Sequence, residues 1–152
     1  MSNKPQPIET KIGTLYAHAV NGDRVYVDCH KDYKTQPPVV IRGREYYIAA
    51  GVTLLPDGTL KADYTQYRDI YINRVGDYSS FPTHGPTIIA AARAAILDAA
   101  RKFLDANPDA LAVAGREQWN MDLLRAERKV KEAQAALADA ESALLAVWDR
   151  EP

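Results

Sequence analysis

The C-terminal part of the chain carries a heptad repeat of apolar residues. Leucine or valine recurs every seven positions, and a second set of mainly alanine residues lies three positions after each of them. The first set is Leu123, Val130, Leu137 and Leu144, and the second is Ala126, Ala133, Ala140 and Val147. This spacing places both sets along one side of a helix and is typical of a coiled coil. It predicts that residues 116–149 form one long helix that associates with a partner.

The length of this helix limits what can cover it within one chain. The helix would extend about 50 Å, whereas the helix predicted before it, at 87–105, would extend about 28 Å. An antiparallel hairpin of the two would therefore bury only part of the longer one. Because exposed apolar patches of that size are uncommon on monomers, we expect a homodimer through this helix. Packing against the chain's own sheet and packing against a different protein are the alternatives.

The composition changes near residue 82. All nine tyrosines precede Phe81, and alanine dominates after Pro86. Strand-forming residues first and helix-forming residues second predict an α+β fold. Residues 1–82 are expected to form an antiparallel β-meander of five to seven strands, either open or closed as a small barrel. Residues 83–152 are expected to form a helical hairpin that packs on the sheet, mediates oligomerisation, or does both.

Turn chemistry divides the first half into strands. Asn-Gly at 21–22, Gly43 within an Arg-Gly-Arg turn and Gly58 after Pro-Asp are typical hairpin turns. The hairpins expected are 15–20 with 24–28, 39–41 with 45–50, and 52–55 with 59–62. A final strand at 68–75 should place Ile70 and Ile72 on one face and Tyr67, Asp69, Tyr71 and Asn73 on the other.

Proline, asparagine and glycine predict the helix boundaries. Pro86 suits the first position of the first helix, and Asn107 suits the N-cap of the second, with Pro108 after it. Gly115 predicts a kink or a break between a short helical turn at 108–114 and the long helix.

Charge and cysteine content exclude several classes of protein. Nineteen basic and twenty acidic side chains nearly cancel, so no overall charge drives the chain toward nucleic acid or an anionic membrane. Cys29 is the only cysteine, which rules out an internal disulfide and favours the cytoplasm. The polar N-terminus does not resemble a signal peptide, and no apolar run approaches the roughly 20 residues of a membrane span.

Residue types that could carry chemistry lack the spacing of known catalytic or metal sites. Cys29 and His30 lie between Asp28 and Asp32, but neither a second cysteine nor a histidine at zinc-finger spacing accompanies them. Consecutive side chains of an extended segment also point to opposite sides. The usual nucleotide-binding glycine motifs are absent. We therefore expect a protein that is not an enzyme, with no cofactor and no bound metal.

Tyrosines in the first half predict a surface for a protein partner. The residues assigned to it are Tyr64, Tyr67 and Tyr71. Tyr67 and Tyr71 share the face opposite Ile70 and Ile72, and tyrosine is enriched at protein interfaces. The alternative is that the helices cover this face.

Arginines mixed with tyrosines favour nucleic-acid binding as the second hypothesis. The residues assigned to it are Arg24, Tyr26, Arg42, Arg44 and Tyr46. Small β-domains hold single strands by combining basic and stacking aromatic residues. Acidic residues are interleaved with these arginines, however, which is equally typical of cross-strand ion pairs in an ordinary sheet.

The segment before Pro86 predicts one further binding site. Ser79, Ser80, Thr83 and His84 precede a helix N-terminus, where backbone N–H groups and the helix dipole favour an anion. A capped linker without a ligand is the alternative.

These patterns together predict a non-enzymatic protein-binding, inhibitor or adaptor protein that acts through surface complementarity. The small size, the missing active-site motif and the sheet-plus-hairpin organisation are similar in general style to accessory proteins of phages and other mobile elements. That similarity implies no residue roles.

Overall fold

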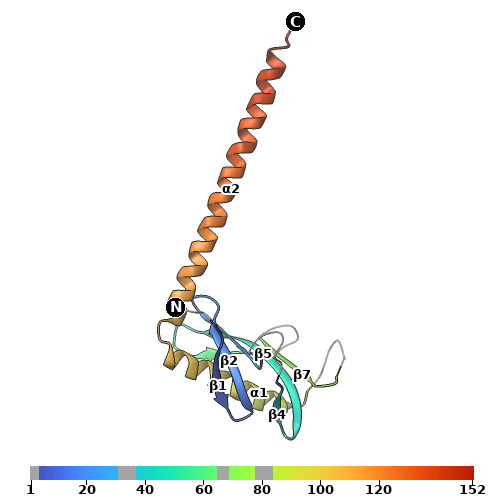
Figure 1. Cartoon of the computed structure of the whole chain (residues 1–152), viewed down its shortest axis with the longest axis vertical. Helices are drawn as coiled ribbons and strands as arrows, with labels where there is room; N and C mark the ends of the chain where they lie inside the picture. The colour runs from blue at the N-terminus through green and yellow to red at the C-terminus, as the bar shows by residue number, and fades with distance from the viewer. Residues whose placement is uncertain (1–3, 31–36, 65–68, 78–83) are drawn as a thin grey trace. The chain divides into compact units, whose positions relative to one another are not determined.

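The computed structural model describes residues 4–30, 37–64, 69–77 and 84–152 (Figure 1). Within these residues, seven antiparallel strands come first and two helices follow, which confirms the predicted α+β class. The strands are β1 (Gln6–Thr10), β2 (Gly13–Ala19), β3 (Arg24–Asp28), β4 (Val39–Ile41), β5 (Arg44–Leu54), β6 (Leu60–Lys61) and β7 (Ile70–Arg74). The helices are α1 (Pro86–Ala106) and α2 (Ala110–Trp148).

The sheet is organised around β5, an 11-residue strand. The order across the sheet is β1-β2-β3-β5-β4, and β6 and β7 also pair with β5. Every one of these pairs is antiparallel. The sheet is not closed, so the open arrangement is the one found. The polar N-terminal sequence did not predict β1, which pairs with β2.

The prediction of two separate strands at 45–50 and 52–55 is wrong, because β5 runs through both. Gly51 continues the strand and pairs with Tyr26 of β3. Glycine weakens a strand, but it is used where another group must approach the backbone closely. The guanidinium group of Arg24 occupies the space where a Cβ on Gly51 would lie, which explains why glycine suits this position.

The hairpin between β2 and β3 forms, but not through the backbone conformation that Asn-Gly usually indicates. Neither Asn21 nor Gly22 has a positive φ. The Val20 N–H instead donates to the Arg24 carbonyl at 2.9 Å, and the Asp23 N–H donates to the Asn21 side-chain oxygen at 3.1 Å. The Asn21 side chain therefore stabilises the loop. Gly22 is left to contact another part of the chain.

The other two predicted turns do use positive φ angles. Arg42 and Gly43, between β4 and β5, have φ angles of 51° and 75°. Gly58, between β5 and β6, has a φ of 87°. Two successive positive values connect β4 and β5 tightly, which places Arg42 at the tip of the hairpin.

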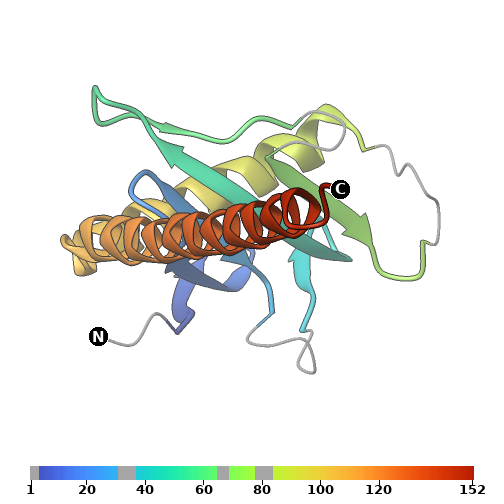
Figure 2. The same cartoon turned by 90° about the horizontal axis from the view of Figure 1, so that it is seen from above.

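Helix α1 covers one face of the sheet and shares its core (Figures 1 and 2). Alternate residues of the strands face α1 and are buried. In the final strand these are Ile70 and Ile72, as predicted. The buried strand residues include Leu15, Ala17, Val25, Val27, Ile48, Val52, Ile70 and Ile72. The buried residues of α1 that complete this core are Ala92, Ala95, Ile96, Ala99, Ala100 and Phe103. The other face of the sheet is left to partly exposed tyrosine, histidine and small residues.

The junction between the helices is anchored to the first strand. Pro86 begins α1 as predicted, with Gly85 at the N-cap. Asn107 is the C-cap of α1 and not the N-cap of the next helix. Its side-chain amide exchanges two hydrogen bonds with the amide of Gln6 in β1, at 2.9 and 3.1 Å. This reciprocal pair ties the end of α1 to the sheet edge.

Of the kink or break expected at Gly115, the break is wrong, because α2 is continuous from Ala110 to Trp148. A Cβ built on Gly115 would lie 2.9 Å from the Cα of Gly22. Glycine costs only about 1 kcal/mol relative to alanine within a helix. Gly115 therefore allows a close backbone approach without ending the helix.

By its internal contacts the chain divides into the units 1–116 and 117–152. Helix α1 shares a core with the sheet and belongs to the first unit. All residues from 117 to 152 are exposed. Within the described part of the chain, neither helix combines the length and the apolar character that crossing a membrane requires.

Candidate protein-binding surfaces

The face of the sheet opposite α1, here called the open face, carries aromatic side chains on neighbouring strands. Backbone pairing aligns His18, Tyr26 and Gly51 in one row across β2, β3 and β5. The adjacent row aligns Tyr16, Asp28, Ala49 and Tyr71. Small residues of β5 thus lie between larger residues of β3 and β7.

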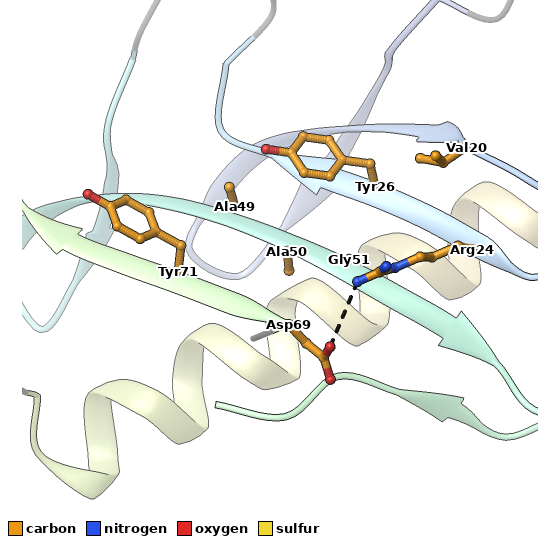
Figure 3. A pocket seen from close by; sticks show the side chains of 8 residues that line it. All are labelled: Val20, Arg24, Tyr26, Ala49, Ala50, Gly51, Asp69 and Tyr71. Atoms are coloured by element: carbon orange, nitrogen blue, oxygen red, sulfur yellow. Dashed lines mark ion pairs between the residues drawn. The ribbon is translucent and has the colours of Figure 1, made fainter. Parts of the chain in front are cut away.

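This alternation of size produces a shallow hollow of about 340 Å³ on the open face (Figure 3). Ala49 and Gly51 of β5 lie between Tyr26 of β3 and Tyr71 of β7. The residues that line it are Val20, Arg24, Tyr26, Ala49, Ala50, Gly51, Asp69 and Tyr71. The Tyr71 side chain is prominent, with 54% of its surface exposed.

An ion pair crosses the middle strand at one end of the hollow. Arg24 Nη2 lies 3.8 Å from Asp69 Oδ1, joining the beginning of β3 to the residue that precedes β7. A Cβ on Gly51 would lie 2.6 Å from Arg24 Nη2, so the guanidinium passes directly over this glycine. Asp69 is itself fixed: its side chain accepts a hydrogen bond from the Asp63 N–H at 3.0 Å, and its carbonyl accepts one from the Gly51 N–H at 2.9 Å.

Tyr26 and His18 are held together beside the hollow. Their ring centroids are 5.6 Å apart. Burial, together with the negative charge of the nearby Asp28 carboxylate, raises the pKa of Tyr26. Burial lowers the pKa of His18, with Asp28 opposing that shift. Both rings therefore favour their neutral forms, which suits contact with a largely apolar partner surface.

Asp28, Cys29 and His30 form the one group of potential metal ligands among the residues that the structure describes. Their ligand atoms lie within 4.8 Å of one another, although the sequence predicted that Cys29 and His30 would point apart. His30 Nδ1 is 3.3 Å from Asp28 Oδ1, and the His30 N–H donates to that oxygen at 2.9 Å.

The environment of the Cys29 thiol does not favour its ionised form. Cys29 is fully buried, and its sulfur accepts a hydrogen bond from the Ile48 N–H at 3.4 Å. Burial raises the pKa of Cys29 to about 11. A nucleophilic cysteine requires the thiolate, which this environment disfavours. These contacts are those of a structural cysteine at the end of β3.

The three tyrosines assigned to a partner surface do not share one environment. Tyr71 lies at the hollow and is exposed. Tyr64 packs against the hydrophobic core, and its ring centroid is 6.4 Å from that of His84. Tyr67 lies outside the described residues.

The residues assigned to nucleic-acid binding are separated by the fold. Arg24 and Tyr26 both line the hollow. Arg42 and Arg44 lie instead at the β4–β5 hairpin. Tyr46 is 3% exposed and faces the core, so its ring is unavailable for stacking on a ligand. The five residues therefore do not make one surface.

Of the residues assigned to an anion site, Ser79, Ser80 and Thr83 lie outside the described residues. His84 is described, and its Nε2 lies 2.9 Å from the Ile72 carbonyl oxygen. Because a carbonyl only accepts, Nε2 must carry the proton in this contact. His84 also meets the ring of Tyr46 at 5.7 Å, so it holds the start of α1 to β7 and the core.

The heptad residues of α2 form a second surface, here called the seam. It consists of Leu123, Ala126, Val130, Ala133, Leu137, Ala140, Leu144 and Val147, all of them exposed. The exposed fraction of its larger side chains ranges from 42% at Leu123 to 60% at Leu137. Apolar exposure repeated over a helix of this length is typical of an association surface.

The sequence did not identify Ala49, Gly51 and Asp69 as residues of a binding surface. The isolated glycine within an apolar strand was the available indication, since glycine there often marks a close approach. Comparison of the chain with protein-family models, with curated proteins and with solved structures finds no match.

Proposed function

We propose that this protein is a non-enzymatic binding protein that occupies the surface of a partner protein with the open face of its sheet. The observation that carries the proposal is the hollow between Tyr26 and Tyr71, with small residues beneath them. Tyrosine combines a large contact area with a low loss of side-chain entropy, which favours it at protein interfaces.

The size and chemistry of the hollow favour a projecting apolar or aromatic side chain from the partner. A volume of about 340 Å³ is at the lower end of the range of ligand pockets, and it is open on one side. The rings of Tyr26 and Tyr71 offer apolar contact, while Arg24 and Asp69 offer a donor and an acceptor at the rim. A side chain held this way is the usual form of an interface hot spot.

The state of the cysteine supports binding over thiol catalysis. Cys29 is the only cysteine in the chain, and it is buried with a raised pKa. The neutral state favoured for Tyr26 and His18 is likewise compatible with a contact surface.

Single-stranded nucleic acid is the second candidate, because Arg24 lies beside Tyr26 in the hollow. Arg24 is already paired with Asp69, however, and Asp28 adds another negative charge to the same face. This mixture suits a protein partner better than a phosphate backbone. Binding to single strands that weakens linearly with the logarithm of salt concentration, and that Arg24→Ala removes, would favour nucleic acid.

The test is capture of partners by the intact chain, followed by mass spectrometry, with three variants. Tyr71→Ser removes the exposed wall of the hollow, and Gly51→Ala displaces Arg24 from its place over β5. Val40→Ser is the matched control, because Val40 is 51% exposed but does not line the hollow. We expect the same protein to be captured by the wild type and the control and lost with both hollow variants. Capture that neither hollow variant reduces, or no capture at all, contradicts the proposal.

A further inference from the structure

The seam of α2 has a regular division into large and small side chains. Leucine or valine occupies the first position of each heptad, and alanine occupies the fourth from Ala126 to Ala140. We propose that a second copy of this chain covers the seam, with the two helices antiparallel and a twofold axis passing between Lys131 and Glu132. The axis would make the interface the same on both copies.

In this register every central layer combines one large and one small side chain. The layers pair Leu123 with Ala140, Ala126 with Leu137 and Val130 with Ala133 of the second copy. The twofold axis repeats each of these layers, so six successive layers have nearly equal volume. Facing large residues with small ones fills the space between helices and allows their backbones to approach evenly.

A parallel pair in register lacks this property. Leucines would meet leucines and alanines would meet alanines, so wide and narrow layers would alternate along the helix. Alanine layers at the spacing set by leucine layers would leave cavities, and cavities are destabilising.

The residues that flank the seam favour the same orientation. In the antiparallel register they are paired as follows: Glu127 with Gln134, Glu141 with Asn120, Lys129 with Ala136, and Asp122 with Ala143. No like charges meet. In the parallel arrangement, Asp122 of each copy would lie beside Glu127 of the other, and such contacts between like charges oppose pairing.

Charge along the helix is also complementary under this twofold axis. The part of α2 before the axis carries five basic residues (Arg116, Arg125, Arg128, Lys129 and Lys131) and three acidic ones (Glu117, Asp122 and Glu127), so its net charge is positive. No lysine or arginine occurs from 132 to 149, whereas Glu132, Asp139, Glu141 and Asp149 lie there. Antiparallel pairing brings the net positive half of each helix beside the negative half of the other, and parallel pairing brings like halves together.

The first measurement is the molar mass of the full chain by sedimentation equilibrium. We expect a dimer for the wild type. Leu137→Asp should raise the dissociation constant by more than about tenfold, because it buries a carboxylate against Ala126. Leu145→Asp is the matched control and should leave the dimer intact. Leu145 and Leu137 are similarly exposed, at 55% and 60%, but Leu145 lies outside the seam.

The second measurement reports the orientation. A spin label at an Ala146→Cys variant should give one distance of about 45 Å between the two copies, from 1.5 Å per residue on either side of the axis. A parallel pair would give less than about 20 Å. The native Cys29 is buried and should remain unlabelled.

The outcomes separate this proposal from the proposed function. A monomeric mass at all concentrations, equal losses from Leu137→Asp and Leu145→Asp, or a short label distance would each overturn the antiparallel dimer. None of these results bears on capture through Tyr71 and Gly51. Conversely, loss of partner capture by the hollow variants leaves the dimer unaffected.

Discussion

Gly115 of α2 and Gly22 of the β2–β3 loop approach so closely that a Cβ on Gly115 would lie 2.9 Å from the Gly22 Cα. The contact is not symmetric, since a Cβ on Gly22 would lie 3.7 Å from the Gly115 Cα, an ordinary van der Waals distance. One glycine is therefore required by its surroundings and the other is not.

Gly115→Ala should destabilise the protein although alanine is the better helix former. The gain in helix propensity is about 1 kcal/mol. The new methyl group meets backbone that cannot move aside cheaply, and overpacking of this kind costs about 1–3 kcal/mol. We expect a net loss of up to about 2 kcal/mol in urea unfolding. Gly22→Ala is the control and should change stability by less than about 0.5 kcal/mol. Equal effects of the two substitutions would argue against this packing.

The break predicted at Gly115 followed from the low helix propensity of glycine. The contact of Gly115 with Gly22 could not be inferred from the sequence. Within the chain, Gly115 is 93 positions from Gly22, and only the tertiary fold brings them together. The Asn-Gly hairpin was located correctly, yet its turn uses the Asn21 side chain in place of positive φ angles. Local patterns thus predicted the strands and helices, but they did not predict that the β2–β3 loop packs against Gly115 of α2.

The open face was predictable only in part, for a similar reason. Alternation along the last strand correctly placed Ile70 and Ile72 in the core and Tyr71 outside it. For β5 the sequence did not decide which residues face the core, because Tyr46 and Tyr47 are adjacent and either could do so. The fold buries Tyr46, and that register brings Gly51 beneath Arg24. A cross-strand register of this kind is not readable from one strand alone.

Gly51→Ala should move Arg24 without unfolding the sheet. The new Cβ would lie 2.6 Å from Arg24 Nη2, which is the end of a flexible side chain and can swing away. The lost ion pair with Asp69 is partly exposed, so its contribution to stability is less than about 1 kcal/mol. We expect the NMR signal of the Arg24 side-chain N–H to shift while the core amide signals stay in place.

Gly85→Ala is the control for this substitution, because nothing lies within 4 Å of a Cβ at Gly85. It should leave the Arg24 signal unchanged. An unchanged Arg24 signal in Gly51→Ala would mean that the guanidinium does not pass over β5.

Cys29 should be almost inert to thiol reagents in the folded protein. With a pKa of about 11, only about one thiol in a thousand is ionised at pH 8, and the sulfur is fully buried. We expect alkylation by iodoacetamide to proceed at the rate of global unfolding and to become fast in denaturant. Rapid labelling under native conditions would show instead that the end of β3 opens locally.

Removing the sulfur should test its hydrogen bond. Cys29→Ala leaves the buried Ile48 N–H without its 3.4 Å acceptor and creates a small cavity. We expect a loss of about 1–3 kcal/mol in the free energy of unfolding. Val27→Ala, a substitution at a fully buried position of β3, the strand that Cys29 follows, provides a comparison for burial alone. A fully neutral Cys29→Ala would show that the N–H finds another partner.

His18 should make stability depend on pH in the mildly acidic range. Burial lowers its pKa below the ordinary value of 6.5, so the unfolded chain binds a proton more readily than the folded chain. Above pH 6.5 both states are neutral at this residue and its contribution is constant. As the pH falls through 6.5, the unfolded state gains the proton first, and the free energy of unfolding decreases. His18→Gln removes this titration while keeping a polar side chain beside Tyr26, so urea unfolding between pH 5 and 7.5 should show a smaller decrease than in the wild type. An identical decrease in the two proteins would assign the pH dependence to other groups.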